Sequence, residues 1–415
     1  MSIPIATTRL TGTRLVAAVC AAQVLVQLGA FFWPALLPRI MPQWGLSNSE
    51  AGWITAAFYG AYLLAVPILV TLTDRIEARL VYLFGVACTI VAHLLFALIA
   101  DGFWPALLLR ALAGVGWAGT YMTGLKLLAD QVDKPLMSRA TAGHAASIGI
   151  SGAVSFACAD LLTSAFGWPF AFLMAAATAL MAWLIVALCA PRRAAPLTPA
   201  ADGHALFDFR PVFRNRSAMA YAVAYCIHTL EMNALRGWGV AFLAYVAVST
   251  GADARFSPTW VLTALGVIGT FASVFGNEAA IRWGRVRLIT LAMLASVAVS
   301  VSLGYLGTLS YSVAVALLLV YGFVVWLDSS SLTAGAAGTA EPSRRGATLA
   351  VHSMLGYSGG FVGPLMIGYT LDLAGGMSRV AWGVSFGLIA VLMLAALVVF
   401  RLMRPRELAG DRGTA

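Results

Sequence analysis

Apolar stretches of about 20 residues recur along nearly the whole chain, and charged residues stand mostly between them. Only 10% of the residues are charged, whereas 61% are hydrophobic. A water-soluble protein of this size would have too little polar surface to cover its core. Lipid is therefore the solvent for most of this chain, and the sequence predicts an integral membrane protein that crosses the bilayer many times.

The apolar stretches are long enough for helices. A bilayer core of about 30 Å requires about 20 residues per helical crossing, and about twelve such segments fit between the charged turns. The strands of a transmembrane barrel are shorter, at roughly ten alternating residues, so we expect an all-α membrane protein. The predicted helices span residues 13–38, 52–73, 80–100, 103–128, 140–163, 167–190, 217–247, 258–281, 288–307, 311–337, 347–371 and 378–400.

The basic residues predict the orientation, because Lys and Arg accumulate in cytoplasmic loops. With the N-terminus inside, only Arg39, Arg255 and Arg379 fall in outer loops. Both termini are therefore predicted to be cytoplasmic. The net charge of +9 follows from this asymmetry and from contact with anionic membrane lipid, so it requires no nucleic-acid partner.

One polar interruption divides the chain. Residues 191–216 are rich in Pro, Ala and Arg, and this predicts a cytoplasmic linker. It separates an N-terminal six-helix bundle, residues 1–190, from a C-terminal six-helix bundle with a short basic tail, residues 217–415. Each half opens its second helix with a start signal, a capping-box spacing at Ser47 and Glu50 and a helix-initiating Pro258. Two pseudo-symmetric halves are typical of transporters.

Basic turns follow the corresponding helix of each half. Asp74, Arg75 and Arg79 follow the second predicted helix, and Arg282, Gly284 and Arg285 follow the eighth. The fourth helix carries an arginine and then a glycine-rich face: Arg110, Gly114, Gly116 and Gly119. With these motifs the chain resembles the major facilitator superfamily over nearly its whole length, and within it the bacterial branch near the nitrate and cyanate permeases.

The resemblance implies a secondary transporter of the bacterial inner membrane that works by alternating access. It implies a central cavity lined mainly by the first, fourth, seventh and tenth helices. It also implies that the basic turns act as gates during the transport cycle. The predicted gating residues are Asp74, Arg75, Arg79, Arg282 and Arg285.

Polar residues within the membrane concentrate on those same four helices. At helical spacing, the fourth helix places a cation and two aromatic rings on one face, and the seventh and tenth carry ionisable groups. The predicted substrate-binding or proton-coupling residues are Arg110, Trp117, Tyr121, His228, Glu231, Arg236, Tyr321, Asp328 and, on the first helix, Gln27.

Two interpretations of these buried charges are open, because each charge in the membrane needs a partner or a wet cavity. In the first, Glu231 or Asp328 carries a proton, and Arg110 and Arg236 hold an anionic group. In the second, the charges form structural ion pairs, for example Glu231 with an arginine of a neighbouring helix. His228 and His352 are read mainly as hydrogen-bonding groups of the helix bundle.

Other functional classes lack their motifs. The sequence has no phosphate-binding G-x-x-x-x-G-K-[ST] loop and no paired Cys or His cluster, so we predict no ATP hydrolysis, no metal and no cofactor. Gly356 to Gly360 spell G-x-S-x-G, but that hydrolase motif requires a strand–turn–helix context. We therefore interpret this stretch as close helix packing, and we predict that the protein is not an enzyme.

The sequence thus predicts a monomeric, proton-coupled transporter of a small anionic organic solute. Its expected partners are that solute, protons and membrane lipid. Efflux of amphipathic drugs is an alternative, because the carboxylates and aromatic rings suit a cationic substrate. A membrane scaffold or sensor that transports nothing is an alternative of another class.

Overall fold

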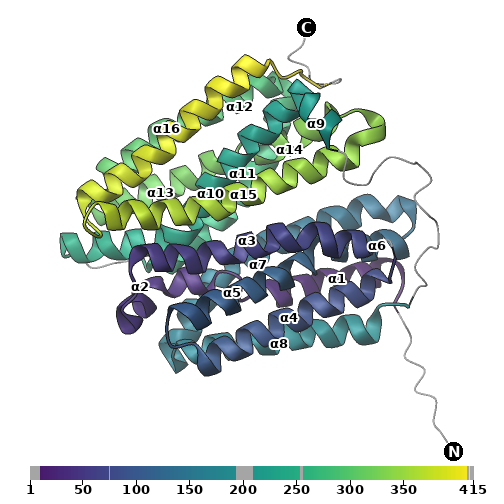
Figure 1. The fold of residues 1–415 in the computed structure, drawn as a ribbon, viewed down its shortest axis with the longest axis horizontal. Coiled ribbons are helices and arrows are strands. Elements are labelled where there is room, and N and C mark those ends of the chain that lie inside the picture. The colour runs from purple at the N-terminus through teal and green to yellow at the C-terminus, as the bar shows by residue number, and fades with distance from the viewer. Residues whose placement is uncertain (1–9, 74, 193–208, 253–255, 409–410, 412–415) are drawn as a thin grey trace, which may run out of the picture. The chain divides into compact units, whose positions relative to one another are not determined.

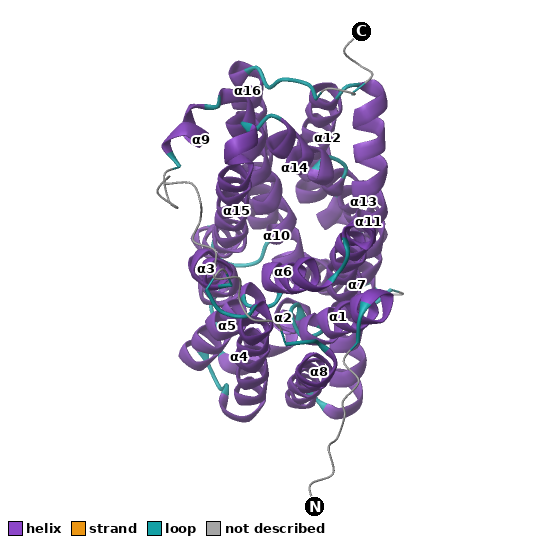
Figure 2. Ribbon diagram, turned by 90° about the vertical axis from the view of Figure 1, so that its right-hand side faces the viewer, coloured by secondary structure: helices purple, strands orange, loops and turns teal. Residues whose placement is uncertain are grey.

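The computed structural model describes residues 10–73, 75–192, 209–252, 256–408 and 411, and the described chain is helical with no strand (Figures 1 and 2). The helices are α1 Gly12–Gln27, α2 Phe32–Trp44, α3 Asn48–Leu72, α4 Ala78–Ile99, α5 Phe103–Ala118, α6 Tyr121–Gln131, α7 Lys134–Phe166, α8 Trp168–Cys189, α9 Arg210–Arg214, α10 Arg216–Thr250, α11 Pro258–Trp283, α12 Arg285–Tyr305, α13 Tyr311–Trp326, α14 Ser329–Gly338, α15 Arg345–Leu373 and α16 Arg379–Met403. Short 3₁₀ turns occur at Gly307–Leu309 and Pro342–Arg344.

Within the described residues, nine helical segments are long and apolar enough to cross a membrane. The all-α prediction is therefore confirmed, and the helices lie over the ranges predicted from the sequence. The predicted linker contains α9, and the rest of it, residues 193–208, lies outside the described residues. The number of membrane crossings and the side on which the termini lie stay predictions.

The chain forms two compact units. Unit 1 comprises residues 1–33 and 60–201, and unit 2 comprises residues 34–59 and 202–415. Unit 1 therefore holds α1, the second part of α3 and α4 to α8. Unit 2 holds α9 to α16 together with most of α2 and the first part of α3.

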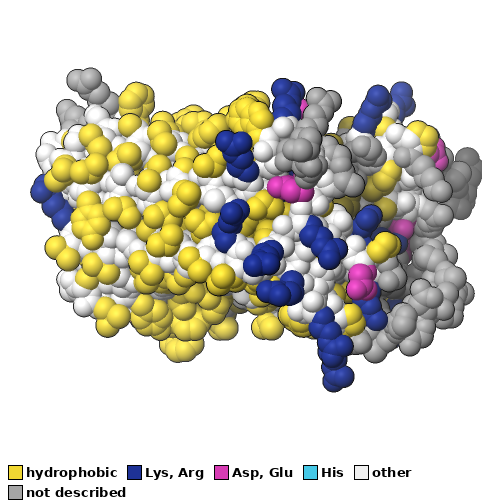
Figure 3. Space-filling model, turned by 90° about the horizontal axis from the view of Figure 1, so that it is seen from above, with side chains coloured by type: hydrophobic (Ala, Val, Ile, Leu, Met, Phe, Trp, Pro, Cys, Tyr) yellow, Lys and Arg dark blue, Asp and Glu magenta, His cyan; other side chains and the backbone are white. Residues whose placement is uncertain are grey.

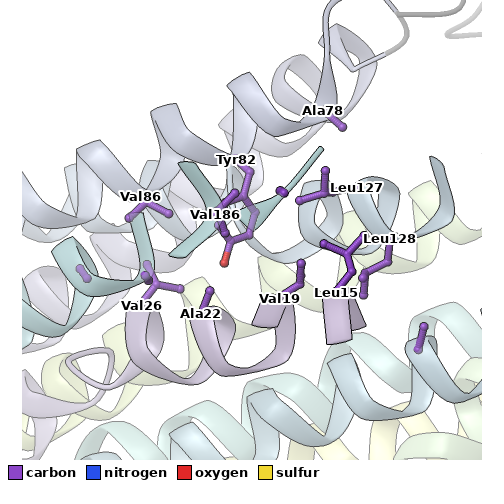
Figure 4. Close-up of a cluster of buried hydrophobic side chains, with 14 residues drawn as sticks. Leu15, Val19, Ala22, Val26, Ala78, Tyr82, Val86, Leu127, Leu128 and Val186 are labelled. Carbon is purple, nitrogen blue, oxygen red and sulfur yellow. The ribbon is translucent and has the colours of Figure 1, made fainter. Parts of the chain in front are cut away.

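The core of unit 1 follows helical periodicity. Leu15, Val19, Ala22 and Val26 recur every three or four residues on one face of α1, and all four are buried (Figure 4). The side chains opposite come from α4, α6 and α8: Tyr82, Val86, Leu127, Leu128 and Val186. This apolar face explains why α1 packs inside unit 1.

The first part of α3 joins unit 2 through its N-terminus. Asp372 of α15 accepts hydrogen bonds from the backbone N–H groups of Asn48 and Ser49, at 3.2 and 2.7 Å. The capping box predicted from the sequence is also present, since Ser47 N–H donates to Glu50 and Glu50 N–H donates to the Ser47 hydroxyl. These acids satisfy N–H groups that the first turn of a helix leaves without partners.

Glycines bring α10 and α15 together in unit 2, where the two helices run side by side (Figures 1 and 2). A Cβ atom on Gly359 would lie 1.9 Å from the carbonyl oxygen of Cys226, and one on Gly363 would lie 2.3 Å from that of Leu230. Thr229 reinforces the contact by donating to the Gly356 carbonyl at 2.6 Å. The G-x-S-x-G stretch thus lies inside one continuous helix and packs against another.

Three membrane segments are broken where the sequence suggested continuous helices. The first breaks at residues 28–31, the fourth at Gly119 and Thr120, and the tenth at Leu327 and Asp328. At the second and third breaks, a glycine of a neighbouring helix allows close backbone approach: Gly85 of α4 faces Gly119, and Gly276 of α11 faces Leu327. Arg110 and Tyr121 were predicted to share one face of a continuous helix, and the second break separates them. The third break likewise separates Tyr321 from Asp328.

Candidate functional site

Glu231 of α10 lies at the centre of a buried polar cluster in unit 2. Its side chain is 1% exposed. One carboxylate oxygen accepts a hydrogen bond from the Tyr321 hydroxyl at 2.5 Å, and the other accepts one from the Ser296 hydroxyl at 3.0 Å. Two neutral donors, from α13 and α12, thus hold this carboxyl group. The alternative in which Glu231 pairs with an arginine is wrong for this structure.

His228, one turn before Glu231, pairs with Asp328. The Nδ1 atom of His228 lies 3.0 Å from the Asp328 Oδ1 atom, and both residues are buried. Asp328 occupies the break between α13 and α14, where the chain leaves the helix and turns its side chain toward α10. The pair lies one helical turn from Glu231 on α10. The structure therefore brings together His228, Glu231, Tyr321 and Asp328, all predicted from the sequence.

Aromatic rings extend the cluster toward α15. The Tyr225 ring stacks on the His352 ring with centroids 4.0 Å apart and on the His228 ring with centroids 5.5 Å apart. The Nε2 atom of His352 lies 3.2 Å from the Thr333 hydroxyl. Two histidines thus lie on either side of one tyrosine, and both belong to a continuous set of polar and aromatic contacts.

Arg236, two turns after His228 on α10, lies over the ring of Trp326 at 4.7 Å from its centroid. A guanidinium over an indole face is a favourable cation–π arrangement. Its charge is therefore stabilised partly by an aromatic face at the end of α13. The contact places the predicted anion-binding arginine in the same unit as Glu231.

Sequence reasoning missed Ser296, Trp326 and Thr333. A serine in an apolar helix carries no signal, because Ser296 is one of many hydroxyl residues on α12 and its neighbours. Trp326 could have been predicted as a cavity residue, since it stands two residues before the predicted Asp328 on a helix that was expected to line the cavity. Its partner on α10 depends on tertiary packing.

In unit 1, Arg110 is bound to the backbone. Its Nη1 atom donates to the carbonyl oxygen of Ala30 at 3.1 Å, and the side chain is buried. Pro34 has no N–H to donate to that carbonyl, so the α1–α2 break leaves an acceptor for Arg110. This contact gives Arg110 a structural role.

The other predicted residues of unit 1 also have local partners. Trp117 packs edge to face against Phe31, with ring centroids 6.4 Å apart. The Gln27 amide oxygen accepts a hydrogen bond from Ser151 at 3.2 Å. Tyr121 begins α6, and its ring stacks with that of His144. Unit 1 thus places the predicted residues among aromatic and hydroxyl partners of α1, α5, α6 and α7.

The predicted gating residues fall into two groups. Arg79 and Arg285 are buried: Arg79 donates to the carbonyl oxygens of Val186 and Ala187, and Arg285 forms a two-pronged pair with Asp411 at 3.1 Å. Arg75 is exposed, and Arg282 pairs with Glu278 on the surface of α11 at 2.9 Å. Asp74 lies outside the described residues. Arg79 and Arg285 therefore each tie the start of a helix to its own unit.

His, Cys, Asp and Glu side chains are the groups of the described residues that could hold a metal ion. Among the residues that the structure describes, no three His, Cys, Asp or Glu side chains come together as metal ligands. The polar cluster of α10 contains a single carboxylate–imidazole pair with a separate carboxyl group. Such a set suits proton binding and hydrogen bonding to a polar solute.

Solved structures share this fold. A bacterial homologue of the human lysosomal transporter Spinster, solved in an inward-facing and occupied conformation, matches with a TM-score of 0.77 and 14% identity over 94% of this chain and 96% of that chain. The nucleoside transporter NupG matches with a TM-score of 0.74 and 13% identity over 94% and 99% of the two chains.

Two relatives are similar to this chain in sequence. The uncharacterised MFS-type transporter YceJ of Bacillus subtilis is 24% identical over 89% of this chain and 91% of its own length. Protein spinster homolog 1 of Homo sapiens is 24% identical over 55% of this chain, and the chain spans less than half, 45%, of that relative's length. The placement near the nitrate and cyanate permeases stays a prediction.

The family model of the Major Facilitator Superfamily matches residues 19–364. The match, the helical fold and the apolar segments agree with one another. This chain is a multi-pass integral membrane protein that belongs to the Major Facilitator Superfamily of transporters.

Proposed function

We propose that this protein is a proton-coupled secondary transporter of a small anionic organic solute in a bacterial inner membrane. The proposal takes the nine apolar segments, together with α5–α6, α10 and α15, as twelve crossings. Arg110 lies in α5, and His228 and Glu231 lie in α10. Arginines between the helices then favour cytoplasmic termini.

The observation that carries proton coupling is the environment of Glu231. Its carboxyl group is fully buried, and its partners in the described structure are the hydroxyls of Tyr321 and Ser296. A carboxyl group held by neutral donors gains and loses a proton without breaking an ion pair. Buried ionisable groups in membrane helices are costly, and they commonly mark ion pathways.

The His228–Asp328 pair supports the same proposal, because it places an imidazole and a second carboxyl group one helical turn from Glu231. Because ionisable groups this close interact, protonation of Glu231 changes the electric field at this pair. Asp328 sits at the break between α13 and α14. A change of charge in the cluster therefore acts directly on the residue that stands between α13 and α14.

Arg236 supports the anionic substrate, since a guanidinium binds carboxylate and phosphate oxygens through paired hydrogen bonds. Arg110 adds less support, because its Nη1 atom donates to the Ala30 carbonyl and so gives the side chain a structural contact. The observation that favours the second candidate, efflux of an amphipathic cation, is the set of rings at Tyr225, His352 and Trp326 beside two carboxyl groups.

The test uses proteoliposomes with a trapped pH reporter. Small carboxylates, inorganic anions, nucleosides and cationic drugs are added in turn, since one structural neighbour is a nucleoside transporter. A proton movement that follows anions supports the proposal, and one that follows cationic drugs supports efflux. A silent panel with correctly folded protein contradicts proton coupling and favours the scaffold or sensor interpretation.

A further inference from the structure

A basic cavity lies at the end of unit 2 where α9, the start of α10, the end of α14 and the end of α16 converge. Its volume is about 760 Å³. Four arginines line it: Arg214, Arg216, Arg404 and Arg406. The cavity lies apart from the polar cluster around Glu231, and none of its lining residues belongs to that cluster.

The cavity carries excess positive charge. Within the described chain, none of the four arginines forms an ion pair. Two acids also line the cavity, but both oxygens of Glu407 accept hydrogen bonds from the backbone of α12, from Arg285 N–H at 2.8 Å and Val286 N–H at 2.9 Å. Glu407 therefore serves the N-terminus of α12, and only Glu341 remains to balance the arginines.

The C-terminal tail holds two of these arginines in place. Arg404 adopts a left-handed backbone conformation with φ of 52°, which turns the chain back over the bundle after α16. The backbone of Arg406 is then fixed at both ends, since its N–H donates to Ser217 at 2.8 Å and its carbonyl accepts from Tyr221 at 2.7 Å. The arginines therefore stand on a pinned segment, which lowers the entropic cost of binding.

The opposite wall is fixed as well. Asn215 caps α10 by accepting from Ala218 N–H at 3.1 Å, and its side-chain amide donates to the Thr339 carbonyl at 2.9 Å. This ties the loop between α9 and α10 to the end of α14. Arg214 and Arg216 flank Asn215 on this loop. The cavity is thus a built feature whose walls are held by hydrogen bonds.

Guanidinium groups bind phosphate oxygens in a fixed fork, so a cluster of arginines that form no ion pair in the described chain suits a phosphate ligand. Arg216 also donates to the Leu402 carbonyl at 3.4 Å. The cavity is larger than inorganic phosphate requires. The chain neighbours of two lining residues, Arg214 and Met403, are exposed apolar side chains: Phe213 is 59% exposed and Leu402 is 68% exposed. Basic side chains gather toward one end of the face shown in Figure 3, and apolar side chains cover much of the remainder.

We propose that this cavity binds the phosphate headgroup of an anionic phospholipid, with the acyl chains against the neighbouring apolar surface. The arginines predict a cytoplasmic location for this end, where a leaflet of anionic lipid attracts basic clusters. A bound headgroup joins the tail to α9 and α10, and so stabilises unit 2 through the segment that carries Glu407 and Asp411.

The experiment measures thermal unfolding and native mass spectra of the full chain in an uncharged detergent. The probes are phosphatidylglycerol, phosphatidylcholine and inorganic phosphate. Wild type is expected to gain stability with phosphatidylglycerol and to retain one bound molecule, whereas phosphatidylcholine has little effect. Arg404→Gln/Arg406→Gln is expected to weaken this binding at least about tenfold, which corresponds to about 1.4 kcal/mol.

The matched control is Arg287→Gln/Arg401→Gln, which removes two exposed charges near the same end but outside the cavity lining. It is expected to bind the lipid as wild type does. If the tail variant unfolds, Arg214→Gln/Arg216→Gln tests the opposite wall by the same mass measurement. Equal losses in control and cavity variants would overturn the site. Full protection by inorganic phosphate alone would overturn its assignment to lipid.

Discussion

The imidazole of His228 and the carboxylate of Asp328 lie 3.0 Å apart inside unit 2 and tie α10 to the break between α13 and α14. Both side chains are buried, at 1% and 4% exposure. The contact therefore joins the continuous helix α10 to the residue that separates α13 from α14. Glu231 lies one turn further along α10, and it accepts hydrogen bonds from α12 and α13.

Removal of His228 alone is expected to be costly. His228→Leu leaves the Asp328 carboxyl group buried without its imidazole, and loss of one partner of a buried pair lowers the free energy of unfolding by about 3–5 kcal/mol. The double variant His228→Leu/Asp328→Leu is expected to recover part of this loss, because no charge remains. Denaturation in detergent measures both, and strictly additive effects would contradict the pairing.

The contact between Arg110 and the Ala30 carbonyl predicts that substitutions at Arg110 and Pro34 have non-additive effects on stability. Arg110→Leu leaves the Ala30 carbonyl without its donor, and an unsatisfied buried polar group costs about 1–3 kcal/mol. Pro34→Ala supplies a backbone N–H for that carbonyl. We therefore expect Arg110→Leu to destabilise the protein less when Pro34→Ala is also present. Thermal unfolding of the four combinations tests this, and equal losses in both backgrounds would refute it.

The α10–α15 packing predicts different results for two glycines. Gly359→Ala places a Cβ 1.9 Å from the Cys226 carbonyl oxygen, so the helices must separate. Overpacking of this kind costs about 1–3 kcal/mol or more. Gly387→Ala in α16 meets nothing within 4 Å and is expected to be neutral or to stabilise by about 0.5–1 kcal/mol. A comparison of unfolding temperatures measures both, and similar losses would disprove the close contact.

The helical ranges were predictable, because uninterrupted apolar length and charged turns are properties of the sequence itself. The capping box at Ser47 and Glu50 was predictable for the same reason, since its partners are three residues apart. The identity of the intramembrane groups was also visible, because ionisable residues stand out in apolar helices. Glu231, His228, Asp328 and Tyr321 are examples, and the structure brings them together.

Their partners were not predictable. Glu231 was paired with an arginine in one interpretation, whereas its donors come from Tyr321, 90 residues away, and Ser296, 65 residues away. Such contacts depend on how helices rotate against one another. The breaks at residues 119–120 and 327–328 were not predicted, whereas Pro34 predicted a kink in the first helix. Pro34 alone gave a signal, since its missing N–H points to a released carbonyl at Ala30.

Glu231→Gln tests the central claim most directly, with the solute class that drives proton movement in wild type. Glutamine keeps the size of the side chain and an acceptor for Tyr321 or Ser296 but does not titrate as a carboxyl group does. Glu278→Gln, which removes a surface acid from α11, is the control. The measurement is internal pH during solute addition to proteoliposomes.

We expect solute-driven proton movement to disappear in Glu231→Gln and to persist in Glu278→Gln, while both variants unfold at temperatures close to that of wild type. Proton movement that continues unchanged in folded Glu231→Gln would contradict the assignment of this carboxyl group as the coupling site.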